Sequence, residues 1–178
     1  MSYRITGTGS CIPDIAKKNS DFLKNKFLDT DGGKFQSSNS EIIDKFNSIT
    51  GICERRYAPD EINCSDLAAV AAGLAINDSK LDQETLDYII VAHNTGDISC
   101  SSGQVDTLPS VASRVKAKLK IKNPNCVAYD IICGCPGWVE GIIQAKSFIK
   151  SGMAEKCLVV GCDTVSYTHL RAHETPLH

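Results

Sequence analysis

The pattern of hydrophobic and polar positions predicts alternating strands and helices. Continuous apolar runs, which are typical of strands buried on both faces, occur at residues 86–94, 125–131 and 156–163. Apolar residues at helical spacing occur at residues 37–51, 64–79, 109–119 and 138–152. A shorter alternating segment at residues 3–9, which ends in glycines, predicts one further strand at the start of the chain.

This order predicts an α/β fold with a mostly parallel sheet and helices on both faces. Strands that alternate with helices of this length are joined by crossovers, and crossovers place the helices over the sheet. Local signals support the helix ends. Ser38 precedes Glu41 by three residues, which is the spacing of a capping box, and Gly51 follows the same helix. Pro109 lies at a first-turn position and Gly152 at a helix end.

The amino-acid composition argues against two classes of function, nucleic-acid binding and membrane association. With 178 residues, of which 42% are hydrophobic and 22% charged, the chain is long enough for one domain or a piece of one. A net charge of −2 and no basic stripe with interleaved aromatics argue against nucleic-acid binding. No apolar run approaches the roughly 20 residues that span a bilayer, so we expect no membrane association and a cytoplasmic location. The basic run at residues 114–122 is interpreted as a solvated helix face.

The nine cysteines are odd in number and no secretory signal accompanies them, so we expect reduced thiols. Cys133 and Cys135 lie one residue apart, but structural zinc sites need a second pair of ligands, and none occurs at suitable spacing. We therefore expect no metal. Cys133 is predicted to pack into the sheet.

Cys135 lies in the stretch DIICGCPGW, between a predicted strand and a predicted helix. Ligands of parallel sheets bind beyond the carboxyl ends of the strands, and the partial positive charge of a helix N-terminus favours a thiolate. Gly134 and Gly137 leave space, and Pro136 restricts the backbone of Cys135, so the turn is able to project the sulfur outward. The spacing alone leaves two interpretations open, a nucleophile or a small residue that closes the turn.

Six segments in this order carry a resemblance to a known family: ITGTGSCIP, TGICERRYA, DYIIVAHNT, PSVASRV, DIICGCPGW and SFIKSGMAEKCLVVGCDTVS. Residues 3–166 resemble the N-terminal half of the beta-ketoacyl-ACP synthase III family, within the thiolase-like superfamily. The resemblance implies a thiolase-like fold with Cys135 as the catalytic residue. It also implies a decarboxylating condensation in fatty acid biosynthesis. An acyl group from acyl-CoA is held on Cys135 and joined to malonyl-ACP, which gives a 3-oxoacyl-ACP.

The resemblance further implies acyl carrier protein and acyl-CoA as partners, a homodimer at full length and no cofactor. The family's catalytic histidine and asparagine lie in a second half for which no motif is present here, so His93 and Asn94 are interpreted as loop residues. Asn94 replaces the catalytic glutamate of hydroxymethylglutaryl-CoA synthases, which argues against that activity. Lys45 and Ile49 replace a tryptophan and an arginine that hold the CoA nucleotide. Residues 21–37 resemble an insertion.

The end of the chain departs from the family. After GCDTVS it reads YTHLRAHETPLH, which contains three of the four histidines. We predict a truncated thiolase-like domain at residues 1–166 and a non-native tail at residues 167–178, with a histidine metal site in the tail as the alternative. The truncated chain is expected to be inactive alone. Two other functions remain open, a hydrolase that uses Cys135 with His93 and a non-catalytic partner subunit of the same fold.

Overall fold

The computed structural model describes residues 3–29, 31–98 and 103–164. The described chain forms two compact units. One contains the N-terminal segment up to Ile12 together with residues 60–163, and the other begins at Pro13 and runs to Pro59. The predicted boundary between a domain and a non-native tail, at residues 166 and 167, lies outside the described residues.

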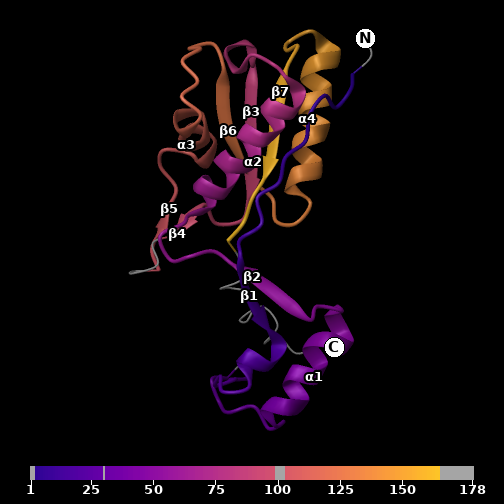
Figure 1. Cartoon of the computed structure of the whole chain (residues 1–178), viewed down its shortest axis with the longest axis vertical. Coiled ribbons are helices and arrows are strands. Elements are labelled where there is room, and N and C mark those ends of the chain that lie inside the picture. Colours follow the sequence, from indigo (N-terminus) through magenta and orange to yellow (C-terminus); the bar gives the residue numbers. More distant parts are fainter. Residues whose placement is uncertain (1–2, 30, 99–102, 165–178) are drawn as a thin grey trace. The chain divides into compact units, whose positions relative to one another are not determined.

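The first unit is built on a three-stranded parallel sheet. The central strand β3 (Tyr88–His93) pairs in parallel with β6 (Val127–Ile132) on one side and with β7 (Cys157–Gly161) on the other (Figure 1). Ile89, Ile90 and Val91 of β3 are 0% exposed, because helices cover both faces. The three strands predicted from continuous apolar runs are confirmed, and so is the α/β fold with a mostly parallel sheet.

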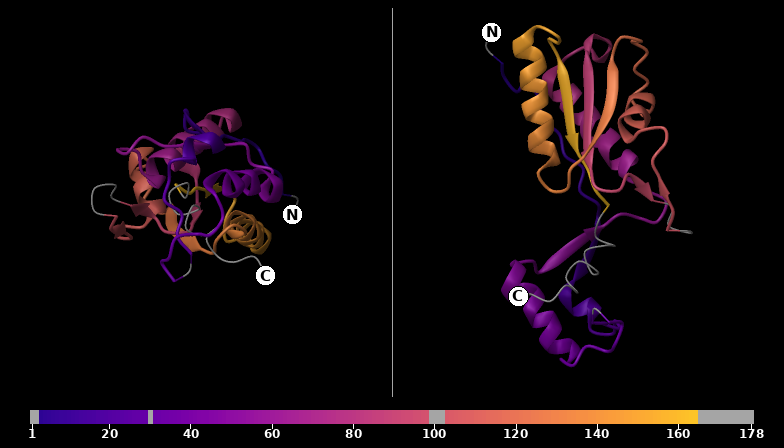
Figure 2. Two further views of the ribbon diagram at one scale, coloured as in Figure 1. Left: turned by 90° about the horizontal axis from the view of Figure 1, so that it is seen from below. Right: turned by 180° about the vertical axis from the view of Figure 1, so that it is seen from behind.

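Helices α2 (Cys64–Ser79) and α3 (Val111–Lys118) lie on one face of this sheet, and α4 (Gly137–Ser151) lies on the other (Figures 1 and 2). The core beneath α2 and α3 consists of small and branched side chains from both helices and the strands, among them Ala68, Ala72, Ile89, Val91, Val111, Val115, Leu158 and Val160. A short antiparallel pair, β4 (Asp97–Ile98) with β5 (Val105–Asp106), and the single turn η2 (Gln83–Thr85) complete the unit. No helix among the described residues is long and apolar enough to cross a bilayer.

Small residues bring α4 into direct contact with the sheet. Gly137, Gly141 and Ala145 recur every four residues, lie on one helix face and are buried. A Cβ added at Gly141 would lie 2.7 Å from the Cγ1 of Val159, and one at Gly137 would lie 3.1 Å from the Cβ of Ala92. The helix backbone therefore lies nearly against the strands, and its first turn is held at their carboxyl ends.

The strand predicted at residues 3–9 is wrong, since none of these residues pairs with a strand. The segment instead follows α2. A Cβ added at Gly7 or Gly9 would overlap backbone atoms of that helix, and the N–H of Thr8 donates to the Oδ2 of Asp78 at 2.9 Å. The two glycines serve this close approach to a helix, which an alternating pattern does not distinguish from the end of a strand.

The second unit has its own aromatic core. It contains β1 (Ile15–Lys18) paired antiparallel with β2 (Glu54–Tyr57), the turn η1 (Asn19–Phe22) and the predicted helix α1 (Asn39–Thr50). The capping box of Ser38 and Glu41 is formed, and Gly51 ends α1 with a φ of 70°. Residues 21–37 supply Phe22 and Phe27 to this core, which also contains Ile42, Ile43 and Phe46.

We expect the Gly141→Ala substitution to destabilise the chain relative to Gly73→Ala. Both glycines lie inside helices, so the gain in helix propensity is shared. A Cβ at Gly73 meets only the Cδ2 of Leu119 at 3.6 Å, an ordinary contact, whereas the one at Gly141 overlaps the stiff side chain of Val159. Urea unfolding should separate the two variants by about 1–3 kcal/mol. Equal midpoints for the two variants would show that α4 does not pack this closely.

Candidate active site

Cys135 lies in the turn between β6 and α4. The strand ends at Ile132, the helix begins at Gly137, and the N–H of Gly137 closes the turn by donating to the carbonyl of Gly134 at 3.0 Å. Gly134 has a φ of +59°, a conformation that favours glycine. The Cys135 side chain is exposed. The predicted position, beyond a strand end and before a helix N-terminus, is confirmed.

The prediction that Cys133 packs into the sheet is wrong, because this residue is also exposed. Pairing of β6 with β3 ends one residue earlier, at Ile132, so Cys133 already belongs to the turn. The apolar run in the sequence therefore extends one residue beyond the hydrogen-bonded ladder.

An open pocket of about 190 Å³ lies beside Cys135. Its walls come from the carboxyl ends of β3 and β7, from the turn and from the first turn of α4. The lining residues are Ala92, Gly134, Cys135, Trp138, Gly161, Cys162 and Asp163. This is the edge at which parallel sheets bind ligands, as the order of the elements predicted.

Trp138 and Gly161 form one wall of this pocket. A Cβ added at Gly161 would lie 3.0 Å from the Cβ of Trp138, so the end of β7 passes directly beneath this residue. The Trp138 side chain nevertheless remains half exposed. A glycine at the end of β7 thus leaves space for a large apolar side chain that lines the same pocket as Cys135.

A carboxylate ties the ends of two strands together at the pocket. Asp163 accepts the backbone N–H of Asn94 at 3.0 Å and its side-chain amide at 2.7 Å. The amide oxygen of Asn94 faces the turn, since a Cβ added at Gly134 would lie 3.5 Å from it. Sequence reasoning treated Asn94 as a loop residue and missed Asp163. The only sequence signal for this contact was that Asn94 and Asp163 each follow a buried strand.

His93 lies on the opposite face of the sheet. Its neighbour Ala92 lines the pocket, and adjacent strand residues point to opposite faces. The His93 ring is buried, and its Nε2 lies 3.0 Å from the Oδ2 of Asp130. Its Nδ1 is buried with no hydrogen-bond partner among the described residues. The structure therefore does not bring His93 and Cys135 together, as a hydrolase using both would require.

Asp130 links β6 to the start of α3. Its carboxylate also accepts the backbone N–H groups of Val111 at 2.8 Å and Ala112 at 2.7 Å. Burial acts to raise the pKa of Asp130, but the hydrogen bonds from His93 and from these two N–H groups outweigh it and lower the pKa below its usual value. Asp130 thus caps the start of α3, and His93 contacts the same carboxylate.

The described residues contain no cluster of three or more histidine, cysteine or acidic side chains that could hold a metal ion. The alternative metal site in the tail, with His169, His173 and His178, lies outside the described residues. Lys45 and Ile49, which replace the nucleotide-holding residues of the resembled family, are exposed on α1.

The sequence of this chain is similar to those of beta-ketoacyl-[acyl-carrier-protein] synthases III. The family model described as 3-oxoacyl-[acyl-carrier-protein] synthase III matches residues 129–174. The chain is 36% identical over 168 residues to beta-ketoacyl-[acyl-carrier-protein] synthase III 1 of Vibrio parahaemolyticus, covering 94% of this chain and 46% of that protein. It is 36% identical to the synthase III of Neisseria gonorrhoeae, covering 93% and 45%. The chain therefore spans about half the length of the curated relatives it matches.

Solved structures are also similar to this chain. The 3-oxoacyl-[acyl-carrier-protein] synthase III of Aquifex aeolicus superimposes with a TM-score of 0.71 at 32% identity, covering 93% of this chain and 46% of that one. Xanthomonas campestris OleA superimposes with a TM-score of 0.72 at 20% identity, covering 97% and 48%, which indicates a shared fold.

Iodoacetamide at neutral pH should label Cys135 faster than any other described cysteine. Cys53 is the matched comparison, because it is also exposed but does not precede a helix. Burial raises the pKa of Cys157 to about 11, so its thiol stays protonated at neutral pH and should label slowly. Mass spectrometry of peptides after short labelling times measures each rate. Equal rates at Cys135 and Cys53 would contradict a special environment at the start of α4.

Proposed function

We propose that this chain, which is related to the beta-ketoacyl-ACP synthase III family, carries the acyl-accepting cysteine of a condensing acyltransferase. The observation that carries the proposal is the place of Cys135. It is an exposed thiol at the start of α4, on an open pocket, within the residues that the synthase III family model matches.

In the proposed first step Cys135 takes an acyl group from acyl-CoA. The thiolate attacks the thioester carbonyl, the new bond from sulfur to carbon forms, and the bond from carbon to the CoA sulfur breaks. The CoA thiolate leaves and takes up a proton. Glycines on both sides of the turn leave room for the acyl carbon to approach the sulfur, and the wall formed by Trp138 offers an apolar surface to the acyl chain.

In the proposed second step malonyl-ACP loses carbon dioxide, and the resulting carbanion attacks the acyl carbon on Cys135. The bond between the acyl carbon and the Cys135 sulfur breaks, the 3-oxoacyl-ACP leaves, and the Cys135 thiolate takes up a proton. Negative charge develops on an oxygen in this step and must be stabilised by preorganised donors. None of the described residues that line the pocket is a histidine, lysine or arginine. We therefore infer that these donors belong to the remainder of a full-length protein.

We propose acyl carrier protein and acyl-CoA as partners, a cytoplasmic location, and a chemistry that requires no metal or other cofactor. We further propose a homodimer at full length. The outer edge of β6 pairs with no strand among the described residues, and its Val127 and Ile132 are exposed. Such an edge is a template for pairing with a second copy.

A Cys135→Ser substitution in the full-length protein should abolish the acyl-enzyme, because serine at this place lacks thiolate character. The matched control is Cys133→Ser, two residues earlier in the same turn and also exposed, which should still be acylated. The mass of the intact protein after incubation with acyl-CoA measures acylation of each variant. Condensation retained in the Cys135→Ser protein would remove this residue from the mechanism.

The same experiment separates the alternatives. Acylation of Cys135 followed by malonyl-dependent condensation supports the synthase. Hydrolysis of acyl-CoA that does not depend on malonyl-ACP would indicate a hydrolase, and no reaction would indicate a non-catalytic partner subunit.

The 178-residue chain by itself should not condense and should associate with itself. Each missing donor costs on the order of a hundred- to a thousand-fold in rate. Apolar side chains on α2 and α4 are also exposed, namely Val70, Leu74, Trp138, Val139 and Ile143. Light scattering measures the association, and a malonyl-ACP-dependent assay measures the activity. A monodisperse chain with condensing activity would overturn this prediction.

A further inference from the structure

The side chains of two cysteines that are far apart in the sequence contact each other. The Sγ atoms of Cys64 and Cys162 lie 2.9 Å apart, although the residues are separated by 98 positions. Cys64 is the first residue of α2, and Cys162 directly follows β7. The contact therefore joins the start of a helix to the carboxyl end of a strand.

We propose that Cys64 and Cys162 are a site of reversible disulfide formation by a hydroperoxide. A disulfide bond is about 2.05 Å long, so the two sulfurs need to approach by only about 0.9 Å. This inference does not depend on the proposed acyl transfer, because it concerns two other sulfurs and a different reaction.

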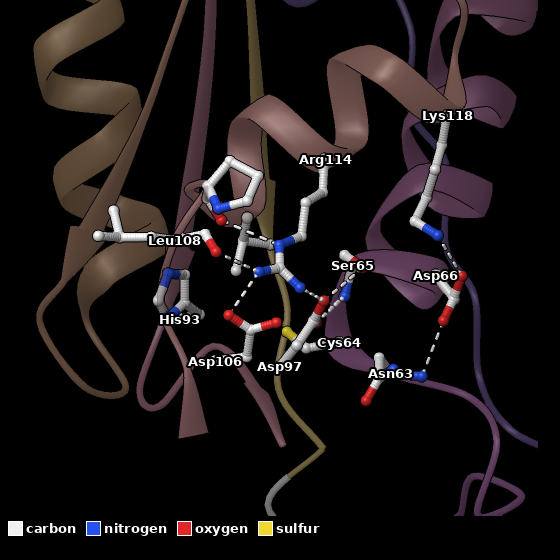
Figure 3. A network of polar contacts seen from close by, with 12 residues as sticks. Asn63, Cys64, Ser65, Asp66, His93, Asp97, Asp106, Leu108, Arg114 and Lys118 are labelled. Atoms are coloured by element: carbon white, nitrogen blue, oxygen red, sulfur yellow. Dashed lines mark hydrogen bonds and ion pairs between the residues drawn. The ribbon is translucent and has the colours of Figure 1, made fainter. Parts of the chain in front are cut away.

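Both cysteines are held by rigid elements. The N–H of Cys162 donates to the carbonyl of Ala92 at 2.9 Å, which extends the pairing of β7 with β3 by one residue. Beside Cys64, the N–H and hydroxyl of Ser65 donate to the buried carboxylate of Asp97 at 2.8 and 2.7 Å (Figure 3). Arg114 also donates to Asp97, at 3.0 Å. The sulfurs therefore face each other in a fixed arrangement.

The two thiols differ in access to solvent. Cys162 is partly exposed, whereas Cys64 is 1% exposed. The hydrogen bond to Cys162, together with burial, raises the pKa of the Cys64 thiol far above its usual value, so Cys64 stays protonated. Cys162 is therefore the more accessible of the two thiols, and we expect it to be oxidised first, with Cys64 as its partner.

The proposed reaction balances with one hydroperoxide. The Cys162 sulfur attacks hydrogen peroxide, the bond between the two oxygens breaks, and Cys162 becomes a sulfenic acid while one water leaves. The sulfur of Cys64 then attacks the sulfur of Cys162. The hydroxyl of the sulfenic acid leaves with the proton of Cys64 as a second water. Two electrons have passed from the two sulfurs to the peroxide, and a dithiol such as dithiothreitol reverses the change.

The test is a peptide map of the 178-residue chain after treatment with hydrogen peroxide and alkylation of the remaining thiols. Trypsin leaves Cys64 within residues 57–80 and Cys162 within residues 157–171. The second peptide also contains Cys157, so fragmentation of the linked pair must locate the bond. We expect a bond between Cys64 and Cys162 that dithiothreitol removes. Its yield in the folded chain should exceed that in urea at least about tenfold, because folding holds the sulfurs together.

Two variants serve as matched controls. Cys162→Ala should abolish the linked peptide. It should leave Cys64 unoxidised, because Cys64 is buried and has lost its partner sulfur. Cys53→Ala removes an exposed cysteine from the other unit and should leave the yield unchanged. A bond to Cys157, an equal yield in urea, or no linked peptide while Cys135 is oxidised in the same sample would each overturn the proposal. The main measurement uses the unaltered chain, so the result does not depend on how well a variant folds.

Discussion

The close approach of α4 to the sheet is the constraint on which the candidate site depends. Helices normally stand off a sheet by the length of the side chains between them, but Gly137 and Gly141 leave no side chain there. The first turn of α4 is consequently pressed against the ends of β3 and β7. A larger residue at either glycine would lift the helix and carry the turn of Cys135 away from the pocket. The packing of this one helix thus determines where the sulfur lies.

Three carboxylates keep the surrounding elements in place. Asp163 joins the ends of β3 and β7 through Asn94, Asp130 joins β6 to the start of α3, and Asp97 joins β4 to the start of α2 through Ser65. Arg114 then connects Asp97 to Asp106 of β5 at 2.9 Å (Figure 3). Two of these carboxylates accept N–H groups from a helix start, where a negative charge also interacts favourably with the helix dipole. Hydrogen bonds and ion pairs of these carboxylates, as well as packing, therefore hold together the elements around the pocket.

Structural features that depend on residues close together in the sequence could be predicted. The three parallel strands and the helices between them follow from apolar runs and cap residues, and the place of Cys135 follows from the order of these elements. Contacts between distant segments were beyond such reasoning. Nothing near Asn94 indicates Asp163, and nothing near Cys64 indicates Cys162. The wrong strand at residues 3–9 has the same origin, because alternation and glycines do not reveal that the neighbour is a helix.

Cys135 and Cys162 line the same pocket, yet their surroundings favour different chemistry. Cys135 stands between two glycines in a turn that borders an open pocket, so an acyl carbon has room to reach its sulfur. Cys162 has a second sulfur already in contact, and that sulfur is held by the start of α2. A thiol with open space before it is suited to attack a carbonyl, whereas a thiol with a fixed sulfur partner is suited to oxidation. The reactivity of each cysteine therefore follows from its neighbours rather than from the residue type they share.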